Sequence, residues 1–181
     1  METNKFKNII VYGELDYVLT ANFANSKDKA KILEYTAKML PMQQNDNGAT
    51  TINSLYVVNN ILEDILELKN DRLLTDVCYI TVPDKLYKAI TKGTYKNWLD
   101  NGIAKTGLVY PKKEINEWVR FATLYAKLFE KVNFRNLTYY SMSNPRYDIA
   151  NVNRHKYLIK QMKIQIDKHK TELLDIVLKK C

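Results

Sequence analysis

The chain has 181 residues, of which 46% are hydrophobic and 27% are charged, and it contains only five glycines and four prolines. This length and composition fit one compact domain and exclude a disordered, collagen-like or disulfide-stapled chain. The formal net charge of +8 at pH 7 favours an acidic partner such as nucleic acid, although a lysine-rich composition also produces such a charge without any binding role.

The cysteines and the first residues predict an intracellular protein. Cys78 lies in an apolar run and Cys181 ends the chain, so their spacing fits neither a metal site nor a disulfide framework. The apolar run that starts at Ile9 has four residues, too few for a signal-peptide core or a membrane span. We therefore expect a cytoplasmic protein that has no membrane contact.

The first half of the chain predicts strands and then a helix. Residues 9–12 and 17–23 favour strands, whereas residues 30–40 fit a strand or a helix. After a turn-rich loop, Asn53 or Ser54 is placed to cap a helix. Apolar residues recur on one face of that helix at Leu55, Val58, Ile61, Leu62, Ile65 and Leu66.

The second half continues with a buried strand over 77–82, which Pro83 stops, and a short helix over 85–91. An irregular excursion with two turn-forming glycines then leads to an amphipathic helix over 114–130. A strand over 134–142 and a lysine-rich helix over 152–178 complete the order.

Several short motifs follow one another in this order at compatible spacing. Thr50-Thr51-Ile52-Asn53 precedes the first strong helix, Pro111 stands seven residues before Trp118, and residues 139–151 form a strand, a loop and the start of a helix. Together they resemble the ribonuclease H family of the bacterial type over roughly residues 5–160. The resemblance implies an α/β fold with a mixed five-stranded sheet flanked by helices. Residues 1–160 would form that domain, and residues 161–181 would be a helical extension packed on the domain or on a partner.

The resemblance also implies where catalytic residues would stand. The family clamps two magnesium ions with four carboxylates, which activate water and stabilise the leaving oxygen. The aligned positions here are Tyr12, Tyr56, Pro83 and His155, none of them acidic. We therefore expect no catalytic residue and no cofactor, with the two tyrosines filling the former metal cleft and His155 at the surface or at the start of a helix.

A relocated metal site is the alternative. Glu14 and Asp16 share a strand face with Tyr12 if that strand continues, and Asp148 lies near the final helix. Asp84 would serve only if it lies beyond the regular strand or if the alignment is shifted by one residue, because a shift of one residue turns a strand side chain to the opposite face. Such a cluster would hold magnesium for a divergent nuclease.

Residues that match the family's nucleic-acid contacts are few. Thr51 and Asn53 align with positions that touch the hybrid, but both are equally suited to capping the helix. Lys96, Trp98 and Lys105 are what remains of the family's basic excursion.

The C-terminal segment offers a second basic surface. Lys163, Lys168 and Lys170 surround an apolar stripe. The stripe would dock on the chain's own sheet, or would form a homodimer or another partner contact.

The sequence thus favours a ribonuclease H-like protein without nuclease activity, acting through a protein or nucleic-acid partner. By analogy, such copies are typical of accessory proteins of phages and mobile elements. The competing hypotheses are the divergent nuclease and a basic nucleic-acid-binding protein that uses its C-terminal helix.

Overall fold

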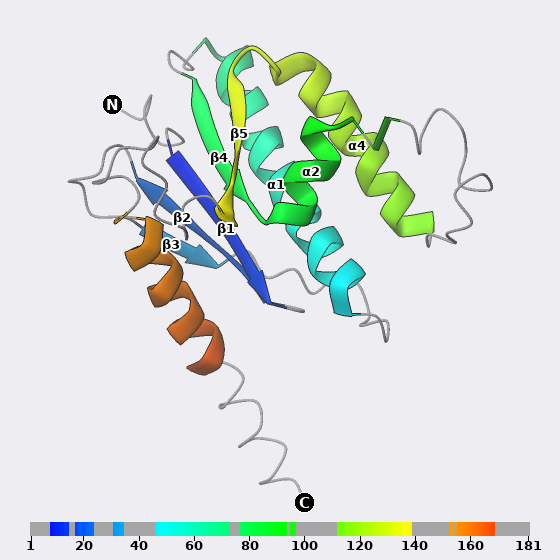
Figure 1. The fold of residues 1–181 in the computed structure, drawn as a ribbon. Coiled ribbons are helices and arrows are strands. Elements are labelled where there is room, and N and C mark those ends of the chain that lie inside the picture. The colour runs from blue at the N-terminus through cyan, green and yellow to red at the C-terminus, as the bar shows by residue number, and fades with distance from the viewer. Residues whose placement is uncertain are drawn as a thin grey trace, which may run out of the picture.

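A mixed five-stranded sheet forms the centre of the protein (Figure 1). The computed structural model describes residues 8–14, 17–23, 31–34, 46–72, 77–93, 95–96, 112–138, 153 and 155–168. The described elements are β1 (Asn8–Glu14), β2 (Tyr17–Phe23), β3 (Lys31–Glu34), α1 (Asp46–Asn70), β4 (Cys78–Val82), α2 (Asp84–Thr91), α4 (Lys112–Leu128) and β5 (Val132–Asn136). Residues 155–168 are also helical and are called the C-terminal helix below.

The strands lie in the order β3-β2-β1-β4-β5. The first three form an antiparallel meander, with Ile10 opposite Ala21 and Ala21 opposite Ile32. β4 runs parallel to β1, and β5 runs parallel to β4. The carboxyl ends of β1, β4 and β5 therefore meet at one edge of the sheet.

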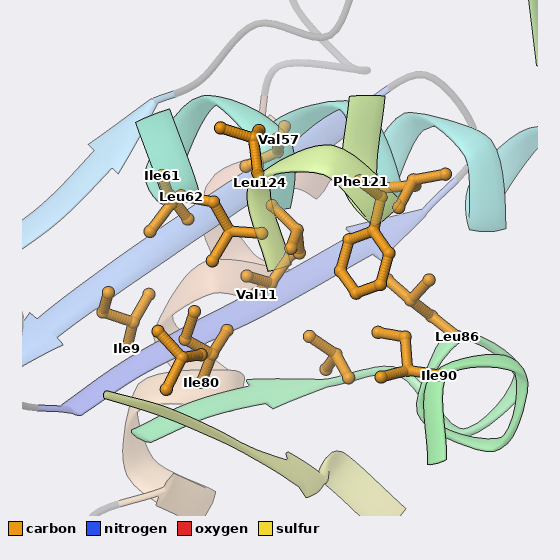
Figure 2. Close-up of a cluster of buried hydrophobic side chains, with 14 of the residues drawn as sticks. Ile9, Val11, Val57, Ile61, Leu62, Ile80, Leu86, Ile90, Phe121 and Leu124 are labelled. Carbon is orange, nitrogen blue, oxygen red and sulfur yellow. The ribbon is translucent and has the colours of Figure 1, made fainter. Parts of the chain in front are cut away.

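One face of the sheet carries the larger core. Alternate strand residues point to it because side chains change face at every residue of a strand. The strand residues buried there are Ile9, Val11, Val18, Cys78, Ile80, Val82 and Val132. Helices α1, α2 and α4 cover them, and Figure 2 shows Ile61, Phe121 and Leu86 directed into the same cluster.

Aromatic rings fill the part of this core nearest α4. Tyr95 stacks on Trp118 with 5.4 Å between the ring centroids, and Phe121 stands edge-on to both. Phe121 also stacks on Tyr125 at 5.3 Å. Burial raises the pKa of the Tyr95 and Tyr125 hydroxyls. Tyr95 is therefore part of the larger core, and Tyr125 packs against it.

The opposite face carries a smaller core under the C-terminal helix (Figure 1). Leu158, Met162 and Ile166 recur along one side of that helix. They pack on Ile10 and on residues of β2, namely Leu19 and Ala21. The described part of the C-terminal helix is therefore docked on its own sheet.

Helices α1 and α4 run side by side in the same direction. Polar contacts join them at a nearly constant spacing, from Asn59 with Glu117 to Lys69 with Lys127. Between these, the Arg120 guanidinium donates to Asn60 at 2.7 Å and pairs with Glu63 at 2.9 Å. The two helices are thus fixed in register by polar groups as well as by their apolar faces.

The α/β class is confirmed, and several element bounds need correction. The first helix begins at Asp46, within the segment predicted as a turn-rich loop, and the predicted caps Asn53 and Ser54 are buried inside the helix rather than at its start. The ambiguous segment 30–40 contains a strand, β3. β5 begins at Val132, two residues earlier than predicted, and ends at Asn136, six residues earlier than predicted, and its residues pair one by one with the five residues of β4. Among the described residues, no helix is both long and apolar enough to cross a membrane.

Candidate functional site

The edge where β1, β4 and β5 end is the candidate site. In sheets with parallel strands, the carboxyl ends of neighbouring strands commonly form the binding crevice. β4 ends at Val82, Pro83 follows it, and Asp84 is the first residue of α2. Asn136 ends the neighbouring strand β5. These side chains stand together because the two strands are in parallel register, with Val82 opposite Asn136.

Of the four acids in the alternative metal set, Asp84 is the one whose side-chain contacts are described. It lies beyond the regular strand, which is the condition that a metal-binding role would need. Its carboxylate, however, accepts a 2.7 Å hydrogen bond from the Asn136 amide and forms a 3.0 Å ion pair with Lys88 one turn along α2. These two contacts, the Asn136 bond first, hold the pKa of the Asp84 carboxyl below its ordinary value. Asp84 is therefore ionised but already engaged.

The Asn136 side chain connects this acid to the next turn of the chain. Its amide oxygen accepts a 3.0 Å hydrogen bond from the backbone N–H of Thr138. Asn136 is 2% exposed. The contact between Asp84 and Asn136 thus joins the end of β4 to the end of β5, which is a structural role that accounts for a buried amide at this position.

His155 lies on the other face of the sheet at the start of the C-terminal helix. It is 2% exposed, so the prediction of a surface residue is wrong, and it lies in the first turn of the described helix 155–168. Its Nε2 lies 3.3 Å from Oγ1 of Thr81, a buried residue of β4. The imidazole therefore ties the C-terminal helix to the sheet, at the position that the sequence resemblance aligns with a carboxylate.

Tyr12 and Tyr56 do not fill one cleft, contrary to the sequence-based expectation. Tyr12 packs against the smaller core under the C-terminal helix. Tyr56 packs against the larger core on the opposite face, and the Arg120 guanidinium lies 5.7 Å above its ring. The alternation of β1 separates them, since Tyr12 faces the same side as Ile10 whereas α1 covers the side of Val11.

Most of the alternative metal set falls outside the described side chains. Glu14 is the last residue of β1 and pairs with Tyr17, but only its backbone is described. Asp16 and Asp148 lie outside the described residues. Within the described part of the chain, no three His, Cys, Asp or Glu side chains gather closely enough to hold a metal ion.

The predicted nucleic-acid residues are scattered. Thr51 and Asn53 lie inside α1 rather than at its start, so neither caps it, and Asn53 is buried. Lys96 is exposed in a short helical turn beside the buried Tyr95. Trp98 and Lys105 lie outside the described residues.

The basic surface of the C-terminal helix is partly described. Lys163 and Lys168 are exposed, and so is Lys160, while Lys170 lies outside the described residues. These three exposed lysines stand away from the side of the helix that packs on the sheet.

Sequence reasoning missed a basic and aromatic pair on the same face of the sheet. The Arg135 guanidinium of β5 lies 3.9 Å from the centre of the Tyr79 ring of β4. The strand alternation contained the signal, because Cys78 and Ile80 point to the larger core and leave Tyr79 on the opposite side. The contact of Tyr79 with Arg135 was not predictable from the sequence. It depends on the register of β5 against β4, in which Tyr79 lies opposite Asn133 and Thr81 opposite Arg135.

No protein-family model and no curated protein matches this chain.

Proposed function

We propose that this chain is a ribonuclease H-like domain that has lost the family's catalytic carboxylates and acts by binding nucleic acid. The observation that carries the proposal is the set of contacts at the carboxyl ends of β4 and β5, the edge that the resemblance aligns with the family's metal site. The acid present there, Asp84, is engaged by Asn136 and Lys88, and the neighbouring family positions hold Pro83 and a buried His155. A hard divalent cation needs several clustered anionic oxygens, which these contacts do not supply.

The fold agrees with this proposal without deciding it. A mixed sheet with helices on both faces is what the resemblance to ribonuclease H implies. The described elements also follow the predicted order of strands, helix, strand, short helix, helix and strand.

Charge favours nucleic acid over protein as the partner. The chain has a net charge of +8, and the C-terminal helix presents Lys160, Lys163 and Lys168 to solvent. On the same face of the sheet, Arg135 lies over Tyr79, and a guanidinium stacked on an aromatic ring is suited to both phosphate and base contacts. Lysine and arginine that displace counterions from phosphates provide most of the sequence-independent affinity for nucleic acids.

Two assays test the two parts of this proposal. An RNA–DNA hybrid incubated with the purified chain and magnesium should stay intact. Cleavage that stops with a chelator, and that Asp84→Asn abolishes, would instead establish the divergent nuclease that uses Glu14, Asp16, Asp84 and Asp148.

Binding should be measured by fluorescence anisotropy with labelled single-stranded, duplex and hybrid oligonucleotides at several salt concentrations. We expect the affinity to fall steeply with salt, and the triple substitution Lys160→Gln, Lys163→Gln and Lys168→Gln to reduce both affinity and salt slope. The charge-matched control replaces three other exposed lysines, namely Lys85 of α2, Lys92 just after α2 and Lys127 of α4. Absent or salt-insensitive binding would reject nucleic acid and leave a protein as the partner.

A further inference from the structure

The exposed side of the C-terminal helix carries a tyrosine, an isoleucine and two lysines in one row. The row consists of Tyr157, Lys160, Ile164 and Lys168 and is called the outer row. Tyr157 is 55% exposed and Ile164 is 53% exposed, although both side chains are large and mainly apolar. Neither of them belongs to the smaller core beneath the helix. The outer row is thus a surface that the packing of the helix on its sheet does not use.

The spacing of the outer row keeps its side chains on one side of the helix. They follow one another at intervals of three, four and four residues, and residues three or four apart are neighbours on a helix surface. At about 1.5 Å per residue the row is about 16 Å long. Apolar and basic side chains alternate along it, in the order tyrosine, lysine, isoleucine, lysine. Aromatic surface combined with positive charge along one track is typical of proteins that bind single-stranded nucleic acid.

The docked side of the same helix argues against a membrane as the partner. A helix that lies on a lipid surface buries a continuous apolar face at the level of the headgroups. In the C-terminal helix that face consists of Leu158, Met162 and Ile166, which are at most 2% exposed because they pack on the sheet. Tyr157 and Ile164 are what the outer row could offer a lipid surface, and they are separated by a lysine.

Charge favours nucleic acid over protein as the occupant of the outer row. Residues 155–168 contain four lysines and one aspartate. Lysine is depleted in protein–protein interfaces, whereas it neutralises phosphates along a nucleic-acid strand. Lys160 and Lys168 stand within the row, and Lys163 is exposed on the same helix. The row therefore fits a polyanion better than it fits a protein surface.

The amino-terminal end of the row lies near a second aromatic and basic pair. Nε2 of His155 lies 3.3 Å from Oγ1 of Thr81, so the first turn of the C-terminal helix stands beside β4. Thr81 lies opposite Arg135 of β5, and the Arg135 guanidinium covers the Tyr79 ring. The turn that carries Tyr157 and the pair of Arg135 with Tyr79 are therefore close together on one face of the sheet.

We propose, on the basis of the nucleic-acid binding inferred above, that the outer row binds single-stranded nucleic acid, with a base stacked on the Tyr157 ring and phosphates held by Lys160 and Lys168. In a duplex the bases are stacked on one another, so their faces are closed to a side chain. In a single strand every base offers a face, and stacking on an aromatic ring tolerates any base. Ile164 lies between the two lysines and provides apolar surface for a second base or a sugar.

Fluorescence anisotropy distinguishes a single strand from a duplex. The wild-type chain should bind a labelled single-stranded oligonucleotide more tightly than the same sequence as a duplex. Tyr157→Ala should weaken binding of the single strand by about fivefold or more and leave the slope against salt unchanged, because a stacked base is lost and no phosphate contact is. Tyr157→Phe keeps the ring and should bind like the wild type. Phe129→Ala is the matched control, since Phe129 is an aromatic residue beyond the end of α4 that is 58% exposed, and it should leave the affinity unchanged.

An abasic oligonucleotide tests the stacking itself. It keeps the phosphates but lacks the bases, so Tyr157→Ala should bind it as well as the wild type does. The double substitution Lys160→Gln and Lys168→Gln should still weaken its binding and reduce the salt slope. Thermal unfolding of Tyr157→Ala should match that of the wild type, because the side chain is mainly exposed.

Two kinds of failure are distinguishable in these measurements. Salt-dependent binding that is equal for single strand and duplex, or that Tyr157→Ala changes no more than Phe129→Ala does, would overturn the outer row as a single-strand site and leave nucleic-acid binding in place. A protein would then be the better occupant of the row. Absent binding of every oligonucleotide would reject the proposed function together with this site.

Discussion

The two faces of the sheet are covered to very different extents. Helices α1, α2 and α4 bury a large cluster against one face, including five aromatic rings in mutual contact. The C-terminal helix buries a small cluster against the other, made of Ile10, Leu19, Ala21, Leu158, Met162 and Ile166. Since the free energy of burial scales roughly with the apolar area removed from water, the C-terminal helix must be the more weakly attached layer.

This difference separates stability from proposed function. The larger core determines whether the sheet forms at all. The smaller core holds the helix that carries the exposed lysines, and His155 anchors that helix beside Thr81. A partner that binds the lysines therefore engages an element whose detachment costs less than global unfolding.

The largest expected effect comes from opening the larger core. Phe121 is fully buried and touches Tyr95, Trp118, Tyr125 and Phe134. Phe121→Ala leaves a cavity among rings that are themselves packed, so we expect a loss of about 3–5 kcal/mol in the free energy of unfolding. Urea denaturation measures it, with the exposed Thr123→Ala on the same helix as the control. A loss below about 1 kcal/mol would show that the aromatic cluster is not a rigid core.

A smaller effect is expected in the second core. Met162→Ala should cost about 2 kcal/mol, at the lower end for such truncations, because a small cluster has fewer contacts to lose. Hydrogen exchange should accelerate mainly in residues 155–168 and leave α1 and α4 protected. Lys163→Ala, at the neighbouring exposed position, is the control. Equal acceleration in all helices would show that the two layers unfold together and would break the comparison.

The smallest effect concerns the strand edge and pH. Because the pKa of the Asp84 carboxyl is lowered in the folded state, by Asn136 first and Lys88 second, Asp84 stabilises the fold above its ordinary pKa of 3.8. That contribution disappears as the pH falls through the lower, folded value. Asp84 is 37% exposed, so solvent screening limits the contribution to less than about 1 kcal/mol.

When the pH falls from neutral to acid, the Asp84→Asn variant should therefore lose slightly less stability than the wild type. Denaturation midpoints at several pH values measure it, and Asp71→Asn, an exposed acid in the turn after α1, is the control. An identical acid response in the two variants would show that the contact with Asn136 has no energetic effect.

Local patterns predicted much of the fold. β2 has the predicted bounds Tyr17–Phe23, and β4, α2 and α4 each begin within two residues of their predicted starts. Apolar alternation and helical spacing are properties of neighbouring residues, so they can be read without knowledge of the tertiary structure. The start of α1 was predicted too late because Asn53 and Ser54 have the chemistry of caps, whereas the helix begins at Asp46, seven residues before Asn53.

The candidate site depended more on tertiary structure. The sequence alone shows that Tyr12, Tyr56, Pro83 and His155 are not acidic, because identity at a position needs no coordinates, and the ribonuclease H alignment that makes these positions matter is a prediction. It could not show that Tyr12 and Tyr56 lie on opposite faces, that His155 is buried against Thr81, or that Asn136 holds Asp84. The contact of His155 with Thr81 joins residues 74 positions apart, and that of Asn136 with Asp84 joins residues 52 positions apart. Strand pairing and helix docking, rather than local preference, decide which distant residues meet.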